Sequence, residues 1–240
     1  MRFAEALLAA PTPVIMEIKP RDSAGRDLLA GRTPAELADR YERAGAACLS
    51  VVTGRWFGGH PGMLAEVTAR TGLPVLQKDL IAGRAAVTRA RELGAAAVLL
   101  TARVLTAETL AALTEAALTH GLTPFVEIAD AAEAAMVVHG ERCVVAVNNK
   151  DIDRREAGTP DLARSLALLP AALDTGTLCP VSASGIATPG EAADLLAAGY
   201  RGLLVGTALL RSANLDGWLT DLRRETTAQG YDAGARRERS

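Results

Sequence analysis

The sequence predicts an α/β fold, a (β/α)8 barrel, on three observations. Eight short apolar runs recur along the 240 residues at a spacing of roughly 25 to 30 residues, with amphipathic stretches between them. These runs are apolar at successive positions, which indicates strands buried on both faces of a parallel sheet. Hydrophobic residues make up 49% of the chain, enough to fill the large core of such a barrel.

The expected strands are the eight apolar runs. They are PVIMEI (13–18), AACLSVV (46–52), LPVLQK (73–78), AAVLLT (96–101), TPFVEI (123–128), CVVAVN (143–148), LCPVSA (178–183) and RGLLVG (201–206). The clearest helices are expected over 33–45, 83–94, 106–121 and 188–199. Three of these begin with Thr-Pro or Thr-Ala, a cap followed by a tolerated first-turn residue, and all four end in the Gly that commonly closes a helix.

The whole chain, residues 1–240, is expected to form one domain. Residues 1–12 would form a short helix leading into the first strand, and residues from about 225 to 240 a polar, frayed tail. A doubly wound open sheet is the alternative fold. That fold normally carries a Gly-rich turn after its first strand, where this chain has KPRDSAG (19–25).

Composition and charge argue against several classes of protein. The net charge is -2 and basic residues are scattered, so no nucleic-acid partner is expected. Neither a signal-peptide pattern nor an apolar run of about 18 residues is found, so we expect no membrane partner. The three cysteines lie far apart beside apolar runs, and the histidines lack ligand spacing. We therefore expect reduced core cysteines, a cytoplasmic protein and no metal site.

All three lysines of the chain fall where a predicted strand ends. They are Lys19, Lys78 and Lys150, among 26 basic residues that are otherwise arginines. Lysine differs from arginine in that it can shift its pKa and give up a proton. Glu17 and Glu127 also stand near strand ends. Groups at the carboxyl ends of barrel strands converge, so these five would form a proton-transfer or anion site.

Glycines after the last two predicted strands indicate a phosphate site. Gly185 follows the seventh strand, and Gly206-Thr207 follows the eighth. Backbone N–H groups can approach an oxyanion closely there, and the start of the following helix would add a favourable dipole. Glycine is also the default turn residue, so the interpretation depends on this placement, which is that of the common phosphate site of barrel enzymes.

These residues, in this order, resemble the indole-3-glycerol phosphate synthase family of (β/α)8 enzymes. The matching pieces are VIMEIK (14–19), LSVVT (49–53), FGG (57–59), LPVLQKDLI (73–81), GAAAVLL (94–100), VEI (126–128), VNNKD (147–151), VSASGI (181–186) and LLVGTALLR (203–211). The resemblance implies a carboxy-lyase of tryptophan biosynthesis that needs no cofactor. It would close the ring of 1-(2-carboxyphenylamino)-1-deoxyribulose 5-phosphate, losing CO2 and water, to give indole-3-glycerol phosphate.

The resemblance implies a role for each residue at the reacting centre. Lys78 would be the general acid at the substrate carbonyl, and Glu127 the general base for the dehydration. Lys19 would pair with an anionic group of the substrate. Glu17 would orient these groups, and Asn148 would hydrogen-bond the reacting region.

The two ends of the substrate would also have their own residues. Ser184 would help to place the substrate, and Lys150 stands where the family usually has Arg. The phosphate would bind at Gly185, Gly206 and Thr207. The anthranilate ring would lie among apolar side chains, for which ordinary core and loop packing is the alternative: Trp56, Phe57, Leu80 and Leu100.

Two departures from the family pattern change the charge of the site. Ala183 stands where the family usually has Glu, and Asp22 places an acid in the loop after the first strand. Alternatives are therefore an isomerase or Schiff-base aldolase acting on a related phosphorylated substrate in a specialised pathway, or a non-catalytic phosphate-ligand-binding barrel. In the simplest alternative, Lys19 and Lys78 are structural ion-pair partners of Glu17 and Glu127. The expected partner is a small phosphorylated molecule, and the expected state is a monomer or homodimer.

Overall fold

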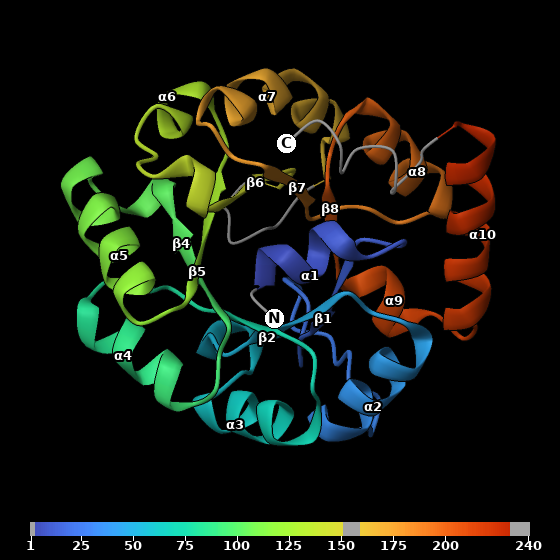
Figure 1. The fold of residues 1–240 in the computed structure, drawn as a ribbon. Coiled ribbons are helices and arrows are strands. Elements are labelled where there is room, and N and C mark those ends of the chain that lie inside the picture. The colour runs from blue at the N-terminus through green and yellow to red at the C-terminus, as the bar shows by residue number, and fades with distance from the viewer. Residues whose placement is uncertain (1–2, 151–158, 231–240) are drawn as a thin grey trace.

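The computed structural model describes residues 3–150 and 159–230 and shows a closed, parallel eight-stranded barrel (Figure 1). The strands pair in chain order, and the last pairs with the first. They are β1 (Val14–Ile18), β2 (Cys48–Val52), β3 (Val75–Lys78), β4 (Ala97–Thr101), β5 (Thr123–Ile128), β6 (Val144–Asn148), β7 (Cys179–Ala183) and β8 (Gly202–Val205). Each begins and ends within two residues of its predicted run. The predicted (β/α)8 barrel is confirmed, and closure excludes the open sheet.

Helices alternate with the strands and surround them (Figure 1). They are α1 (Phe3–Ala9), α2 (Pro34–Ala44), α3 (Pro61–Arg70), α4 (Arg84–Glu92), α5 (Ala107–Thr119), α6 (Ala131–Ala134), α7 (Leu162–Asp174), α8 (Pro189–Ala198), α9 (Thr207–Arg211) and α10 (Leu215–Ala228), with 3-10 turns η1 (Arg55–Phe57), η2 (Ala102–Val104) and η3 (Gly140–Arg142). Thr33, Thr106 and Thr188 cap α2, α5 and α8 as predicted. α10 continues to Ala228, past the expected start of the polar tail, and 231–240 lie outside the described residues. No helix in the described part of the chain is long and apolar enough to cross a membrane.

Side chains of the strands alternate between two hydrophobic layers. In β4, Ala97 and Leu99 belong to the cluster inside the barrel, whereas Val98 and Leu100 belong to the larger cluster between the sheet and the helices. This alternation follows from the pleat, which turns successive side chains to opposite faces. The same parity decides which polar residues near the strand ends can reach the barrel interior.

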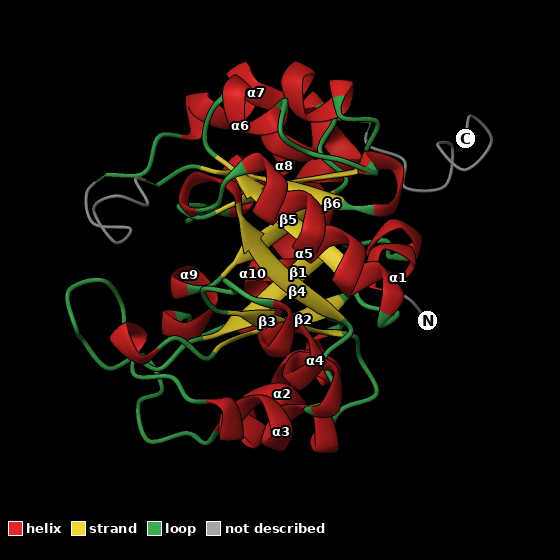
Figure 2. Ribbon diagram, turned by 90° about the vertical axis from the view of Figure 1, so that its left-hand side faces the viewer, coloured by secondary structure: helices red, strands yellow, loops and turns green. Residues whose placement is uncertain are grey.

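α1 closes the amino-terminal end of the barrel. The Phe3 ring meets Phe125 edge to face, with 6.2 Å between the ring centroids, and the Cys48 thiol donates to the Phe3 carbonyl at 3.5 Å. A Cβ on Gly202, the first residue of β8, would overlap the Leu7 side chain. Figure 2 shows α1 at one end of the barrel and α9 at the other. α1 and the apolar residues that it covers therefore lie at the end of the barrel opposite the carboxyl ends of the strands.

Candidate active site

The carboxyl ends of β1 and β3 bring two amines to one carboxylate. Lys19 Nζ lies 2.8 Å from Glu17 Oε1, and Lys78 Nζ lies 3.7 Å from Glu17 Oε2. All three side chains are buried, with residue exposures of 5%, 2% and 6% for Lys19, Glu17 and Lys78. Burial strengthens the attraction between such groups because the surrounding dielectric is low. The Glu17 carboxylate therefore joins the lysines that follow the first strand and end the third.

An apolar cavity of about 370 Å³ opens beside Lys78. Glu127, near the end of β5, lines the same cavity, so the expected acid and base both border it. The remaining lining residues are Val52, Gly54, Trp56, Phe57, Asp79, Leu80, Leu99, Thr101 and Val104. We call this the apolar cavity. It offers mostly hydrocarbon and aromatic surface, which suits a flat aromatic group.

Three of the expected ring contacts, Trp56, Phe57 and Leu80, line the apolar cavity. Phe57 is buried, and Lys19 Nζ lies 5.4 Å from its ring centroid, a cation–π contact that links the ring wall to the triad. Trp56 packs against Phe57 with 6.2 Å between ring centroids and remains half exposed at the rim. The aromatic wall of the apolar cavity is therefore in contact with Lys19 of the triad.

The expectation for Leu100 is wrong. This side chain is fully buried in the outer layer between sheet and helices, and its neighbour Leu99 lines the cavity instead. The reason is strand parity, since positions 99 and 101 point inward and 100 points outward. The run AAVLLT is apolar on both faces, so the sequence carried no signal that distinguished Leu99 from Leu100.

A second cavity, of about 450 Å³, lies beside Glu17 and Lys19. We call it the cationic cavity, because most of its charged side chains are basic. The expected substrate and phosphate residues line it together: Lys150, Ser184, Gly185, Gly206 and Thr207. Its other charged or hydroxyl-bearing lining residues are Asp22, Ser23, Arg26 and Arg211. Glu17 and Lys19 therefore lie at the cationic cavity while Lys78, paired with the same carboxylate, lies at the apolar one.

Backbone geometry explains the glycines of the cationic cavity. Ser184 and Gly185 have φ of +70° and +81°, and a Cβ on Gly185 would overlap Pro160. Asn149 holds this turn, because its Nδ2 donates to the carbonyls of Ala183 and Ser184, each at 3.1 Å. α8 begins only at Pro189 and α9 has five residues, so the backbone of the turns, rather than a long helix dipole, presents N–H groups here.

Gly206 allows β8 to approach the triad. A Cβ at this position would overlap Glu17 Oε1, the oxygen that pairs with Lys19. The residue's φ of -116° lies outside the left-handed region, so the positive φ that favours glycine does not apply here, and the contact with Glu17 supplies a requirement of space. Gly206, which lines the cationic cavity, is therefore in direct contact with the Glu17 carboxylate of the triad.

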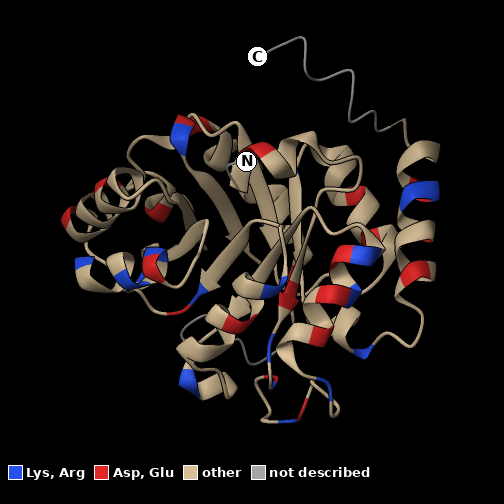
Figure 3. Cartoon of the chain, turned by 60° about the horizontal axis from the view of Figure 1, so that its bottom comes forward, with Lys and Arg blue, Asp and Glu red and all other residues tan. Residues whose placement is uncertain are grey.

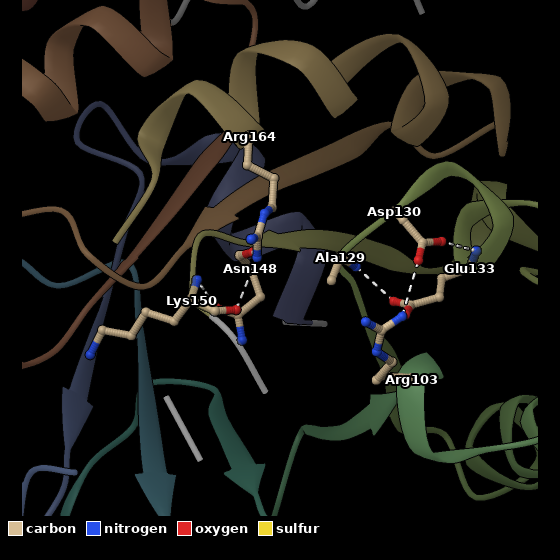
Figure 4. A network of polar contacts seen from close by, with 7 residues as sticks. All are labelled: Arg103, Ala129, Asp130, Glu133, Asn148, Lys150 and Arg164. Atoms are coloured by element: carbon tan, nitrogen blue, oxygen red, sulfur yellow. Dashed lines mark hydrogen bonds and ion pairs between the residues drawn. The ribbon is translucent and has the colours of Figure 1, made fainter. Parts of the chain in front are cut away.

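Arg164 fixes the end of β6, a role that the sequence did not reveal (Figure 4). Its Nη1 donates to the carbonyls of Asn148 and Lys150, both at 3.1 Å. The Asn148 side chain in turn accepts from the Lys150 backbone N–H at 2.9 Å. Asn148 is fully buried, and among the described residues its Nδ2 has no hydrogen-bond partner. A buried amide donor of this kind is costly unless a ligand or water accepts from it.

A second network fixes the loops after β4 and β5 (Figure 4). Arg103 Nη1 lies 3.1 Å from Glu133 Oε1 and 3.2 Å from Asp130 Oδ2. Glu133 Oε2 accepts from the Ala129 N–H at 2.7 Å, two residues beyond Glu127. Burial raises the pKa of Glu133, and the contacts with Ala129 and Arg103 only partly oppose this, so the net shift is upward. The network ties the strand that carries Glu127 to its neighbour.

Asp22 is buried in the loop after β1 and binds two arginines. Its Oδ2 accepts from Arg26 Nε at 2.8 Å and from Arg211 Nη2 at 2.7 Å. Its Oδ1 accepts the backbone N–H groups of Ala24 and Arg26 at 2.9 and 3.0 Å. Burial raises the pKa of Asp22, but the hydrogen bonds from Arg26 and Ala24 outweigh it, so the pKa falls below its usual value.

Among the described residues, no group of three His, Cys, Asp or Glu side chains could hold a metal ion.

A family model described as indole-3-glycerol phosphate synthase matches residues 1–222. The chain belongs to the indole-3-glycerol phosphate synthase family. The indole-3-glycerol phosphate synthase of Pyrococcus furiosus is 34% identical over 207 residues, 86% of this chain and 89% of that protein. The tryptophan biosynthesis protein TrpCD of Archaeoglobus fulgidus is 38% identical over 208 residues, 85% of this chain but only 36% of that longer protein.

A solved structure with low sequence identity to this chain supports the fold alone. It is the crystal structure of 3-hexulose-6-phosphate synthase from Salmonella typhimurium, which superposes with a TM-score of 0.67. The superposition covers 90% of this chain and 99% of that one, at 14% sequence identity. The family resemblance expected from the sequence is confirmed by the family match and the curated relatives.

Proposed function

We propose that this member of the family closes the ring of 1-(2-carboxyphenylamino)-1-deoxyribulose 5-phosphate and releases CO2, water and indole-3-glycerol phosphate. The observation that carries the proposal is the position of the Glu17 carboxylate. It pairs with Lys19 at the cationic cavity and with Lys78 at the apolar one. A substrate with an aromatic ring at one end and a phosphate at the other fits two such cavities on either side of a proton-transfer centre.

Binding both ends of this flexible substrate would itself promote ring closure. The ring would lie in the apolar cavity beside Phe57 and Leu80, and the phosphate in the cationic cavity at Gly185, Gly206 and Thr207. Ser184 and Lys150 line the cationic cavity and would contact the sugar phosphate. Holding two reacting carbons at contact distance lowers the entropy cost of joining them, which is worth several orders of magnitude in rate.

Lys78, Lys19 and Glu127 would carry the proton transfers. Lys78 would protonate the substrate carbonyl oxygen while the ring carbon that bears the carboxylate attacks the carbonyl carbon. Loss of CO2 then restores the aromatic ring. Lys19 would then give a proton to the new hydroxyl, which leaves as water while Glu127 removes a proton from the adjacent carbon. Lys19 would hold the departing carboxylate, Glu17 would keep both lysines in place, and the buried amide of Asn148 would donate to a substrate oxygen.

The test is a fluorescence assay for indole-3-glycerol phosphate formed from the carboxyphenylamino substrate. Turnover is expected in the wild type, with loss of about 100-fold or more in kcat for Lys78→Ala and a strong reduction for Glu127→Gln, as is typical when a general acid or base is removed. Arg224→Ala, an exposed ion-pair residue of α10, is the matched control and should retain activity. Robust turnover by Lys78→Ala would rule out its role as the acid.

We propose further that the chain works in a reducing compartment such as the cytoplasm. Its three cysteines, at positions 48, 143 and 179, are free and buried. Burial raises the pKa of the Cys143 and Cys179 thiols to about 12, which keeps them protonated and unreactive. Whether the enzyme is a monomer or a homodimer stays a prediction.

A further inference from the structure

The Arg26–Asp22–Arg211 cluster lines the cationic cavity. Asp22 and Arg26 lie in the loop after β1, whereas Arg211 ends α9, which follows β8. All three residues line the cavity that contains Gly206 and Thr207. One carboxylate oxygen joins both guanidinium groups, at 2.8 and 2.7 Å. The first and the last βα connections of the barrel are therefore tied together beside the expected phosphate.

Asp22 is the fixed centre of this cluster. It is 7% exposed, and its carboxylate accepts four hydrogen bonds, which come from Arg26, Arg211 and the Ala24 N–H. The side chains of Arg26 and Arg211 are 67% and 47% exposed. A guanidinium carries five N–H donors, and the bond to Asp22 occupies one donor of each arginine. The buried acid thus orients two partly exposed cations that keep donors for another acceptor.

Backbone contacts also hold the end of α9 in place. Arg32 Nη2 donates to the Leu210 carbonyl at 2.8 Å, and Arg40 Nη2 donates to the Ser212 carbonyl at 3.2 Å. These carbonyls flank Arg211 on both sides. The backbone of Arg211 is therefore anchored, which reduces the entropy lost when its side chain binds a ligand.

The charge balance of the cationic cavity matches a phosphate dianion. Four basic side chains, Lys19, Arg26, Lys150 and Arg211, and two carboxylates, Glu17 and Asp22, line it among the described residues. This leaves an excess of two positive charges. Arginine also suits the purpose geometrically, because its planar fork pairs with two oxygens of one phosphate.

We propose that Arg26 and Arg211 bind the phosphate of the substrate, and that Asp22 is a positioning residue which holds both guanidinium groups over the cationic cavity. This inference rests on the proposed function and identifies the side chains that select a phosphorylated substrate. It also explains why an acidic residue, Asp22, lies beside the expected phosphate site. A carboxylate alone would repel the phosphate, but here it organises two cations that outweigh it.

The first test removes each arginine. Arg211→Gln and Arg26→Gln should each raise KM, and the inhibition constant of inorganic phosphate, by about 10-fold, as expected for the loss of a charge-assisted hydrogen bond at a partly exposed site. The value of kcat should change little, because neither residue touches the reacting atoms. Arg224→Gln, which removes an arginine that pairs with Asp221 on α10, is the matched control. Unchanged phosphate inhibition in both variants would overturn the proposal.

The second test distinguishes two explanations of Asp22, which predict opposite changes in the affinity for inorganic phosphate. Asp22→Asn keeps the size of the side chain and an oxygen for the N–H groups of Ala24 and Arg26, but it removes the charge that orients the guanidinium groups. If Asp22 positions the arginines, inorganic phosphate should bind about 3- to 10-fold more weakly. If Asp22 acts only as a repelling charge, phosphate should bind more tightly, and that result would contradict the inference.

Direct calorimetric titration with inorganic phosphate separates this inference from the proposed function. A wild-type protein that binds phosphate through Arg211 but does not turn over the carboxyphenylamino substrate would contradict the proposed function alone. A protein with full turnover and the same phosphate affinity in wild type, Arg26→Gln and Arg211→Gln would contradict the inference alone. Arg211→Lys, which keeps the charge but not the planar fork, should lie between wild type and Arg211→Gln.

Discussion

At the scale of single residues, Gly206 allows the backbone after β8 to lie against the Glu17 carboxylate at the cationic cavity. Replacing it with Ala would push a methyl group into Glu17 Oε1 and displace the carboxylate that pairs with Lys19 and Lys78. We expect kcat/KM to fall about 100-fold for Gly206→Ala, since a shift of about 1 Å in positioned groups has effects of that size. Steady-state kinetics of the variant and the wild type measure this change in kcat/KM.

Gly83→Ala is the matched control for this substitution. A Cβ at Gly83 would meet no heavy atom within 4 Å, and the residue precedes α4 with an extended backbone that alanine also adopts. Its activity should stay near that of the wild type. Equal activity of the Gly206→Ala and Gly83→Ala variants would mean that the position of Glu17 tolerates displacement, contrary to our account.

The sequence predicted the triad because position along a strand determines direction. Glu17 and Lys19 are two residues apart and so face the same side, and the carboxyl end of a parallel strand is the functional end of a barrel. Leu100 was predicted at the ring because an uninterrupted apolar run gives no parity signal. The role of Arg164 could not be predicted, because its bonds to Asn148 and Lys150 depend on how α7 packs and on how far a long side chain reaches.

At the scale of elements, α1 supports the fold at the end opposite the site. Leu7 is fully buried and packs against Gly202, while Phe3 meets Phe125. Truncation of such a side chain leaves a cavity, so Leu7→Ala should lower the free energy of unfolding by about 2–5 kcal/mol. Chemical denaturation monitored by circular dichroism measures this change.

The activity of the Leu7→Ala variant is the informative control. Because α1 lies at the amino-terminal end of the barrel, kcat per folded molecule should equal that of the wild type under conditions in which both are folded (Figure 2). Leu8→Ala, on the same helix but only partly buried, should destabilise less. A large loss of kcat in folded Leu7→Ala would show that α1 acts on the site, which our account excludes.

The elements themselves were largely predictable, and for local reasons. Thr-Pro and Thr-Ala pairs mark the starts of α2, α5 and α8, since the Thr side chain accepts the free N–H of the first turn. The four clearest helices begin and end within two residues of their expected ranges, whereas no such boundaries could be read from the sequence for the short α6 and α9. The Arg26–Asp22–Arg211 cluster was not predictable either, since Arg211 lies 189 residues from Asp22.

At the scale of the whole molecule, charges of both signs are spread over the helices and loops (Figure 3), whereas the buried charges gather at the carboxyl end of the barrel. Among these buried charges, Asp22 makes the stability of the fold depend on pH in the acid range. Its pKa in the folded state lies below the ordinary 3.8, so the folded protein holds this proton less tightly than the unfolded chain. The group therefore stabilises the fold above about pH 4, and this contribution is lost as the pH falls through that range.

We expect the stability of the wild type to decrease more steeply between about pH 5 and pH 3 than that of Asp22→Asn. Thermal unfolding across this range, monitored by circular dichroism, measures the difference. At neutral pH the wild type should be the more stable of the two, because only the ionised carboxylate attracts both guanidinium groups. Parallel pH profiles would show that the cluster contributes nothing to stability.

The proposed function requires one spatial arrangement, in which a single substrate spans both cavities and meets Lys78 between its ends. A crystal structure with an analogue whose carbonyl is reduced to an alcohol tests it most directly. We predict the phosphate at Gly185 and Gly206, the aromatic ring beside Phe57, and the alcohol oxygen within about 3 Å of Lys78 Nζ. An analogue bound with its phosphate outside the cationic cavity, or with that oxygen far from Lys78, would contradict the account.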